Sequence, residues 1–186
     1  MIRIKKANKK KNRICQGDIY KNVEFIEYIL ETKGTVEISK ILFPLVIVLT
    51  QDCDLAQDFK FRYGKPKQKN QDKYLLSVLV APLYNIEHVY HGEHLSEINI
   101  LMETISKKGS SGNYLITNQR PRYHYLEFPP EIPIVPSIVD FKHYFSVNVE
   151  YLRKINKTNF LCQVSELYRE DISQRFTSFL ARIALP

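Results

Sequence analysis

The sequence predicts an α+β fold that is mainly β: a small barrel with one inserted helix and a C-terminal helix. Three observations predict it. Short apolar segments follow one another at close spacing, as strands of a small barrel do. Aromatic residues that favour strands are abundant, with twelve Tyr and ten Phe. One amphipathic stripe closes the chain and predicts a terminal helix. At 186 residues, a single domain is expected.

The first half of the chain is expected to supply most of the barrel. Residues 14–23 predict a first strand with a bend or bulge at Gly17-Asp18, and residues 24–31 alternate between apolar and acidic side chains. The run Leu45 to Leu49 is continuously apolar, as in a strand that is buried on both faces. In order, we expect a strand at 14–23, its continuation at 24–31, a turn at 33–34, one or two strands within 36–49, a mobile loop at 59–73 and a strand at 74–83.

The second half mixes helical and strand signals. Apolar residues between 85 and 107 recur at three- and four-residue spacing, which predicts a helix with Ser96 as a candidate N-cap. The stripe from Ile172 to Ile183 predicts the final helix. In order, we expect a helix at 85–107, a hairpin formed by 114–117 and 123–128, a proline-rich connector, strands at 138–147 and 160–164, and a helix at 165–184.

The net charge of +7 is concentrated at the N-terminus. Residues 1–13 contain seven Lys and Arg and no acidic residue, so the rest of the chain is formally neutral. We therefore expect a basic disordered tail at 1–13 and one domain at 14–186. Such a tail contacts phosphates through counterion release, and a purely solubilising role is equally consistent with it. The cations nearest the domain are Lys9, Lys10, Lys11 and Arg13.

The sequence favours a cytoplasmic protein without membrane contact. No apolar run approaches the roughly 20 residues that span a bilayer. The three cysteines, Cys15, Cys53 and Cys162, are widely separated and odd in number, which argues against a disulfide framework. A reducing compartment is the simplest expectation.

Two segments together resemble PemK/MazF-like proteins of bacteria. Gln16-Gly17-Asp18-Ile19-Tyr20 resembles their opening strand, and Pro44 to Thr50 resembles their next core strand. The resemblance covers about residues 14–84 and implies an SH3-like barrel with a C-terminal helix, in a toxin–antitoxin or phage-defence setting. Many members cut RNA, but their arginine before the strand proline is replaced by Phe43 here, and the nearest hydroxyl, Ser77, lies among apolar residues. The toxin chemistry is therefore not implied.

The Asp52-Cys53-Asp54 segment directly follows the most apolar strand, and we expect it to form a turn. Strand ends hold side chains rigidly, so these three residues form the predicted site. Cys53 is a possible site thiol, although flanking carboxylates raise a thiol's pKa and disfavour the reactive thiolate. The alternative is a structural turn in which Asp accepts backbone hydrogen bonds while Cys53 packs inward.

A second acidic candidate is Asp140. If Asp140 and Lys142 alternate on a strand, they share a face, and Asp52 or Asp54 could add a second carboxylate from a neighbouring strand. Metal-dependent nucleases use this arrangement with Mg²⁺; cross-strand ion pairing explains the Asp140-x-Lys142 pattern equally well. A further three-residue spacing, at His88, His91 and His94, does not bring all three rings to one metal and predicts a solvated stretch.

Basic residues recur in two further places. In the expected loop, Lys60, Arg62 and Lys65 alternate with Phe61 and Tyr63, a composition that suits single-stranded nucleic acid and also an ordinary solvated loop. On the final helix, Arg169 and Arg175 predict either a phosphate-binding surface or a solvated face with salt bridges.

Three functions follow in order of preference. The first is a bacterial nucleic-acid-binding module with an SH3-like barrel, which needs no cofactor and binds RNA or DNA. The second is a metal-dependent nuclease that uses Asp52, Asp54 and Asp140 with Mg²⁺. The third is a non-catalytic adaptor that binds a protein from the same operon. The sequence leaves open whether the protein is an enzyme.

Overall fold

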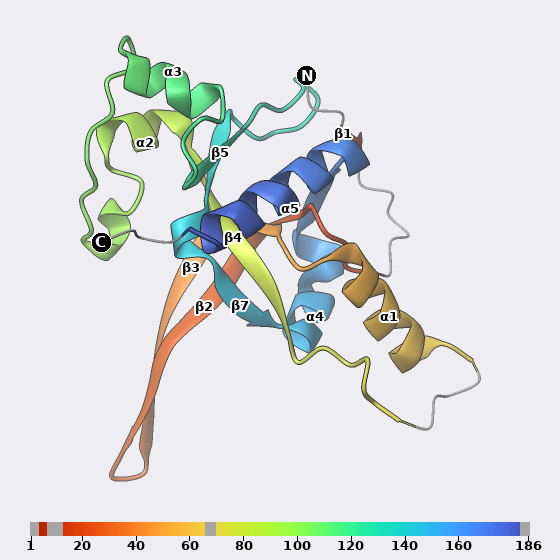
Figure 1. Ribbon diagram of the computed structural model, residues 1–186. Helices are drawn as coiled ribbons and strands as arrows, with labels where there is room; N and C mark the ends of the chain where they lie inside the picture. The colour runs from red at the N-terminus through yellow and green to blue at the C-terminus, as the bar shows by residue number, and fades with distance from the viewer. Residues whose placement is uncertain (1–3, 7–12, 66–69, 183–186) are drawn as a thin grey trace.

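The computed structural model describes residues 4–6, 13–65 and 70–182, and its centre is a strongly bent antiparallel sheet (Figure 1). The strand order is β1-β8-β2-β3-β4-β6-β5, and β7 also pairs with β4. The strands are β1 (Ile4–Lys6), β2 (Asp18–Thr32), β3 (Thr35–Val48), β4 (Ser77–Asn85), β5 (Tyr123–Leu126), β6 (Ser137–Asp140), β7 (Phe145–Asn148) and β8 (Phe160–Val164). The helices are α1 (Asp52–Tyr63), α2 (Ile86–His91), α3 (Ser110–Ile116), α4 (Val149–Asn159) and α5 (Glu166–Leu180), with 3₁₀ turns η1 (Ser96–Ile98) and η2 (Phe141–His143).

The longest strands, β2 and β3, form one hairpin. Lys33 and Gly34 at its tip both have positive φ, the conformation that a two-residue hairpin turn with the natural twist requires. The inner half of the hairpin lies in the sheet, whereas the outer half projects from the molecule (Figure 1). A register shift between Ile26 and Tyr28 separates the two halves. We call residues 24–42 the arm.

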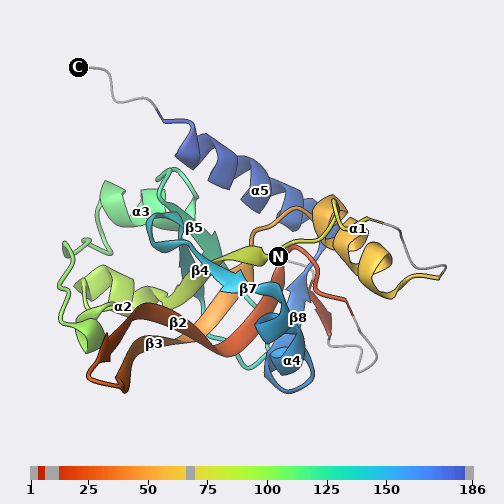
Figure 2. The ribbon, with the colours of Figure 1, turned by 90° about the horizontal axis from the view of Figure 1, so that it is seen from below.

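Both faces of the inner sheet are buried. On one face Ile19, Ile47 and Cys162 are buried in a cluster with Phe176 and Phe179 of α5, which crosses that face (Figure 2). On the other face, Tyr20 and Val46 are buried with α4 and α2 side chains. Neighbouring residues of a strand point to opposite faces, so consecutive apolar residues contribute side chains to both cores.

The α+β fold class and the C-terminal helix are confirmed, as are the strand at 160–164 and the strands of the first half, except that residues 14–17 precede β2 and form no strand. The domain prediction is wrong for Ile4–Lys6, whose backbone pairs antiparallel with β8 instead of belonging to a disordered tail. Residues 1–3 and 7–12 of the expected tail, including Lys9, Lys10 and Lys11, lie outside the described residues.

Several expected elements are corrected. The helix expected at 85–107 is helical only at Ile86–His91, and the hairpin partner of β5 is β6, because 114–116 belong to α3. The loop expected at 59–73 begins with the last turns of α1, and η2 interrupts the strand expected at 138–147. No helix within the described residues is long and apolar enough to cross a membrane.

Gly92 explains why the helix ends early. Its φ of 72° lies in the left-handed region, and its N–H bonds to the carbonyl of Val89 as the chain turns away. A Cβ at this position would lie 2.2 Å from the carbonyl oxygen of Met102. The chain therefore doubles back on itself at Gly92, and the apolar residues beyond it pack in an irregular segment.

We expect Gly92→Ala to lower the free energy of unfolding more than Gly34→Ala. Both glycines have positive φ, so both variants carry a conformational cost of about 1–2 kcal/mol. A Cβ on Gly34 meets no atom within 4 Å, whereas a Cβ on Gly92 displaces the Met102 backbone, which adds about 2 kcal/mol. Urea denaturation of both variants measures the difference, and equal losses would contradict the close approach.

Candidate functional site

The Asp52-Cys53-Asp54 segment is the first turn of α1, not the expected turn between strands. It follows β3 after a short connection, so the sheet fixes its position. The Gln51 side chain makes no capping hydrogen bond, and the two carboxylates lie at the helix end where negative charge is favourable.

Asp52 is the best-connected residue of this turn. Its Oδ2 lies 3.0 Å from the Arg13 guanidinium, and its Oδ1 accepts the Gln16 N–H at 3.3 Å and lies 3.8 Å from Arg169. Burial opposes ionisation of Asp52, but the Arg13 hydrogen bond and charge outweigh it, so the pKa of Asp52 is below its usual value. Asp52 thus joins α1, α5 and the segment before β2.

A polar groove of about 650 Å³ opens beside Asp52, between the start of α1 and α5. Cys53 is exposed on its wall, with Sγ 3.6 Å from Gln51 Oε1 and 3.7 Å from Asp54 Oδ1. The walls are amide, hydroxyl and charged groups that suit a polar ligand: Gln16, Gln51, Asp52, Cys53, Arg169, Glu170, Ser173, Gln174, Thr177 and Ser178. Asp54 is exposed beside the groove and does not line it.

Two arginines predicted to bind nucleic acid have structural partners instead. Arg62 pairs with the buried Asp58 at 2.7 Å, donates to the Leu75 carbonyl and lies over the Tyr74 ring. Arg175 donates to the carbonyls of Arg120 and Tyr123, and burial lowers its pKa. Arg13 and Arg169 both face Asp52. Residue spacing could not reveal these partners, and nucleic-acid contact by Arg62 and Arg175 stays a prediction.

The exposed cations that remain near α1 lie on a surface shared with α4. Arg153 of α4 forms an ion pair with Asp58 of α1, and its guanidinium also donates to the Tyr63 hydroxyl at 3.3 Å. Arg62 pairs with Glu150 at 3.2 Å and adds a second link. We call the exposed residues around this contact the α1–α4 surface, in which one paired glutamate accompanies four lysines and a tyrosine: Glu150, Lys60, Tyr63, Lys65, Lys154 and Lys157.

Asp140 lies in a separate, buried polar cluster. Its carboxylate accepts two bonds from Arg122, at 2.8 and 2.5 Å, and one from the Lys142 N–H at 3.0 Å, and it lies 2.9 Å from His143 Nδ1. Burial opposes ionisation, but the bonds from Arg122 and His143 outweigh it and lower the pKa of Asp140 to about 2.

This geometry corrects two expectations. Asp140 ends β6 and Lys142 belongs to a 3₁₀ turn, so the pair does not alternate on a strand. Within the described ranges, no three or more His, Cys, Asp or Glu side chains are grouped to hold a metal ion. The structure therefore does not assemble Asp52, Asp54 and Asp140 into the predicted Mg²⁺ site.

Sequence reasoning missed most partners of Asp140. His88 and His91 are exposed as expected, but the His94 side chain is 1% exposed, with Nε2 4.0 Å from Asp140. The Tyr84 ring lies 4.8 Å from the His94 ring. These residues come from distant parts of the chain, and no local spacing signals that they meet.

Comparison of the chain with protein-family models and with curated proteins finds no match. The resemblance to PemK/MazF-like proteins therefore stays a prediction.

We expect Asp140→Asn to destabilise the fold by about 3 kcal/mol near neutral pH, because it leaves the Arg122 charge without its partner. The pKa of Asp140 is lower in the folded protein than in the unfolded chain, so its ionised form stabilises the fold above about pH 3.8. This stabilisation is lost as the pH falls towards 2. The wild type should therefore lose stability between about pH 4 and pH 2, and the variant should lose less over that interval. Urea denaturation at several pH values measures both, and parallel pH profiles would contradict this account.

Proposed function

We propose that this protein binds single-stranded nucleic acid through the α1–α4 surface. The observation that carries the proposal is the exposed Tyr63 ring among exposed lysines. Lysines attract the phosphate backbone, and an exposed aromatic ring accepts a stacked base of any sequence. Tyr63 is 55% exposed and held in place by Arg153, whose guanidinium lies 5.0 Å from the ring centroid.

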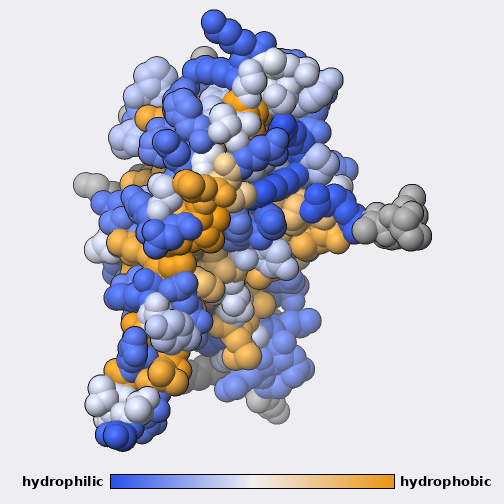
Figure 3. Space-filling view, turned by 90° about the vertical axis from the view of Figure 1, so that its left-hand side faces the viewer, coloured by the Kyte–Doolittle hydropathy of each residue, from blue (hydrophilic) through white to orange (hydrophobic). Residues whose placement is uncertain are grey.

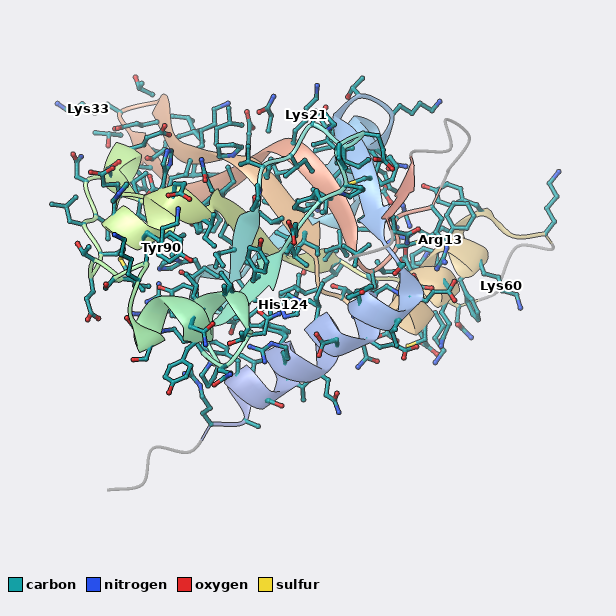
Figure 4. The ribbon with its side chains drawn as sticks, turned by 90° about the horizontal axis from the view of Figure 1, so that it is seen from above. Arg13, Lys21, Lys33, Lys60, Tyr90 and His124 are labelled. Atoms are coloured by element: carbon teal, nitrogen blue, oxygen red, sulfur yellow. The ribbon has the colours of Figure 1, made fainter. Side chains whose placement is uncertain are left out.

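The distribution of charge supports this choice of surface. The arm contains four glutamates against two lysines, and residues 86–107 contain four glutamates against one lysine. Both segments lie away from α1: Figure 4 places Lys60 and Arg13 at one end of the molecule and Lys33 and Tyr90 at the other. A polyanion is therefore attracted to the α1–α4 end and repelled from the arm.

The basic N-terminal segment adds to the same electrostatic attraction. β1 pairs with β8, which directly follows α4. The backbone of Ile4–Lys6 therefore lies beside the strand that follows the helix carrying Lys154 and Lys157. In the sequence, residues 1–13 contain seven cations. The toxin–antitoxin or phage-defence setting belongs to this proposal and rests on the resemblance alone.

We expect the double variant Lys60→Ala, Lys157→Ala to bind fluorescent oligo(U) and oligo(dT) more weakly than the wild type. Each lost phosphate contact should reduce the slope of log K against log salt concentration by about 0.7 for a single strand. Tyr63→Ala should weaken binding by about 1–3 kcal/mol through lost stacking, with an unchanged salt slope. Fluorescence anisotropy over a range of salt concentrations measures both effects.

The matched control is Lys33→Ala with Lys108→Ala, which removes two exposed lysines from the acidic end. This variant should bind both oligonucleotides as the wild type does. Equal losses of affinity in the two double variants would mean that binding depends only on the net charge of the protein. Absence of binding by the folded wild type would overturn the proposal and favour the adaptor function.

A further inference from the structure

A cleft on the side of the molecule near the base of the arm has the composition of a ligand site. Two adjoining hollows of about 310 and 230 Å³ lie between β3 and the irregular segment that follows α2. They share five lining residues, which make them one cleft: Ile41, Phe43, Tyr84, Leu95 and Ile98. We call it the Tyr84 cleft. It is distinct from the α1–α4 surface.

The Tyr84 hydroxyl is the first sign of a ligand. Tyr84 is 8% exposed, and its hydroxyl is buried without a hydrogen-bond partner among the described residues. A buried hydroxyl without a partner is costly, and folded proteins usually satisfy such groups. Because Tyr84 lines both hollows, a ligand in either one lies beside this ring.

Two histidines supply further polar groups on the same walls. Burial lowers the pKa of His94 to about 4, so the ring is neutral near pH 7. Both ring nitrogens are buried, and Nε2 lies 4.0 Å from Asp140. His143 lines the second hollow and directs Nδ1 at the Asp140 carboxylate, 2.9 Å away.

The remaining walls determine the charge and shape of the ligand. Aromatic side chains flank the second hollow: Phe25, Phe43, Tyr144 and Phe145. The exposed Glu93 and Glu97 line the first hollow, and the nearby Arg122 is already paired with Asp140. Anions are therefore disfavoured, whereas a flat ring with its own donors and acceptors matches both the aromatic walls and the polar groups beside them.

We propose that the Tyr84 cleft binds an uncharged, planar heteroaromatic ligand of the nucleoside class. The ring stacks on the aromatic walls, and its polar edge is directed at Tyr84 and at the partly exposed His143. A 5′-phosphate on the ligand meets the glutamates and weakens binding. The site goes beyond nucleic-acid binding at the α1–α4 surface and does not depend on it.

The test uses adenosine, guanosine, cytidine and uridine, each beside its 5′-monophosphate, in titrations followed by protein-observed NMR. We expect at least one nucleoside to saturate, with shifts confined to the cleft, and to bind at least fivefold more tightly than its monophosphate. Tyr84→Phe should weaken that binding at least tenfold. Its melting temperature should be unchanged or raised, because a hydroxyl without a protein partner is removed.

The control for Tyr84→Phe is Tyr114→Phe, which removes a hydroxyl from a ring that is 45% exposed on α3. This variant, and the Lys60→Ala, Lys157→Ala variant, should bind the nucleoside as the wild type does. Saturation by none of the four nucleosides, equal binding by Tyr84→Phe, or equal binding of the monophosphate would overturn the proposal. Each outcome is independent of whether oligonucleotides bind the α1–α4 surface.

A separate observation concerns the arm. Residues 36, 38, 40 and 42 alternate along β3 and share one face, and their partners on β2 share it too: Val36 with Glu31, Ile38 with Ile29, Lys40 with Ile26 and Leu42 with Glu24. The five aliphatic residues of this face, which we call the arm stripe, are each between 53 and 60% exposed: Ile26, Ile29, Val36, Ile38 and Leu42. Figure 3 shows apolar groups continuing down the arm towards its tip.

The charges on this face include one ion pair within the chain, in which Lys40 Nζ lies 2.6 Å from Glu24. Glu31 lies towards the tip and Lys40 towards the base, with Ile29 and Ile38 between them. If two arms stack face to face with opposite directions about a two-fold axis at Ile29 and Ile38, each Glu31 lies level with the other copy's Lys40, one strand across, and adds a second carboxylate to its pair with Glu24. The aliphatic residues then cover one another. Such an isologous contact closes as a dimer.

We infer that the arm stripe is the contact of a two-fold dimer. Sedimentation velocity over a wide concentration range should show a monomer–dimer equilibrium. Ile29→Lys should give a monomer at every concentration, while Leu30→Lys, on the opposite face and 52% exposed, should keep the dimer. Glu31→Lys should weaken the dimer by placing like charges together. A monomeric wild type, or equal disruption by Leu30→Lys, would overturn the inference.

Discussion

The inner halves of β2 and β3 are apolar on both faces, and the rest of the structure depends on this arrangement. One face, with Ile19 and Ile47, is covered by α5, and the other, with Tyr20 and Val46, is covered from the side of α4 and α2. A sheet buried on both faces must place its polar groups at strand ends. Asp52 follows the end of β3, and Asp140 is the last residue of β6. Both polar clusters are consequences of a two-sided core.

Arginine and lysine have different roles in this structure. Arg62, Arg122, Arg153 and Arg175 each bond to buried carboxylates or backbone carbonyls, which the several fixed donors of a guanidinium can satisfy together. The lysines of α1 and α4 remain at the surface. Positive charge that holds the fold together is therefore largely separate from the positive charge available to a partner. Sequence counts of basic residues cannot make this separation.

The parts of the fold that could be predicted from sequence are those with a local period. Alternating strands in the first half and the stripe of α5 identify their elements because each buries a regular face. Helix α1 was not predicted, because ion pairs of Asp58 with Arg62 and Arg153 hold it in place and it has no apolar stripe. Asn148, which caps α4 by accepting two backbone N–H groups, was a usable signal that spacing arguments overlooked.

The candidate sites were also only partly predictable from the sequence. Asp52 was found because it follows a buried strand, and Asp140 because of its two-residue spacing from Lys142. Their partners could not be found, since Arg13, Arg122 and His143 reach these carboxylates only after distant strands pair. Contacts between elements far apart in the chain carry no local pattern.

The strand order also has a consequence for synthesis on the ribosome. β8 lies between β1 and β2, so the strand made last completes the pairing of the two made first. Until residue 164 leaves the exit tunnel, the edge of β2 at Asp18–Tyr20 has no neighbour on that side. The β2–β3 hairpin, whose contacts are close in sequence, can form early, but the sheet stays open along β2. A nascent chain stalled before β8 would therefore display an unpaired strand edge that invites chaperones or another nascent chain.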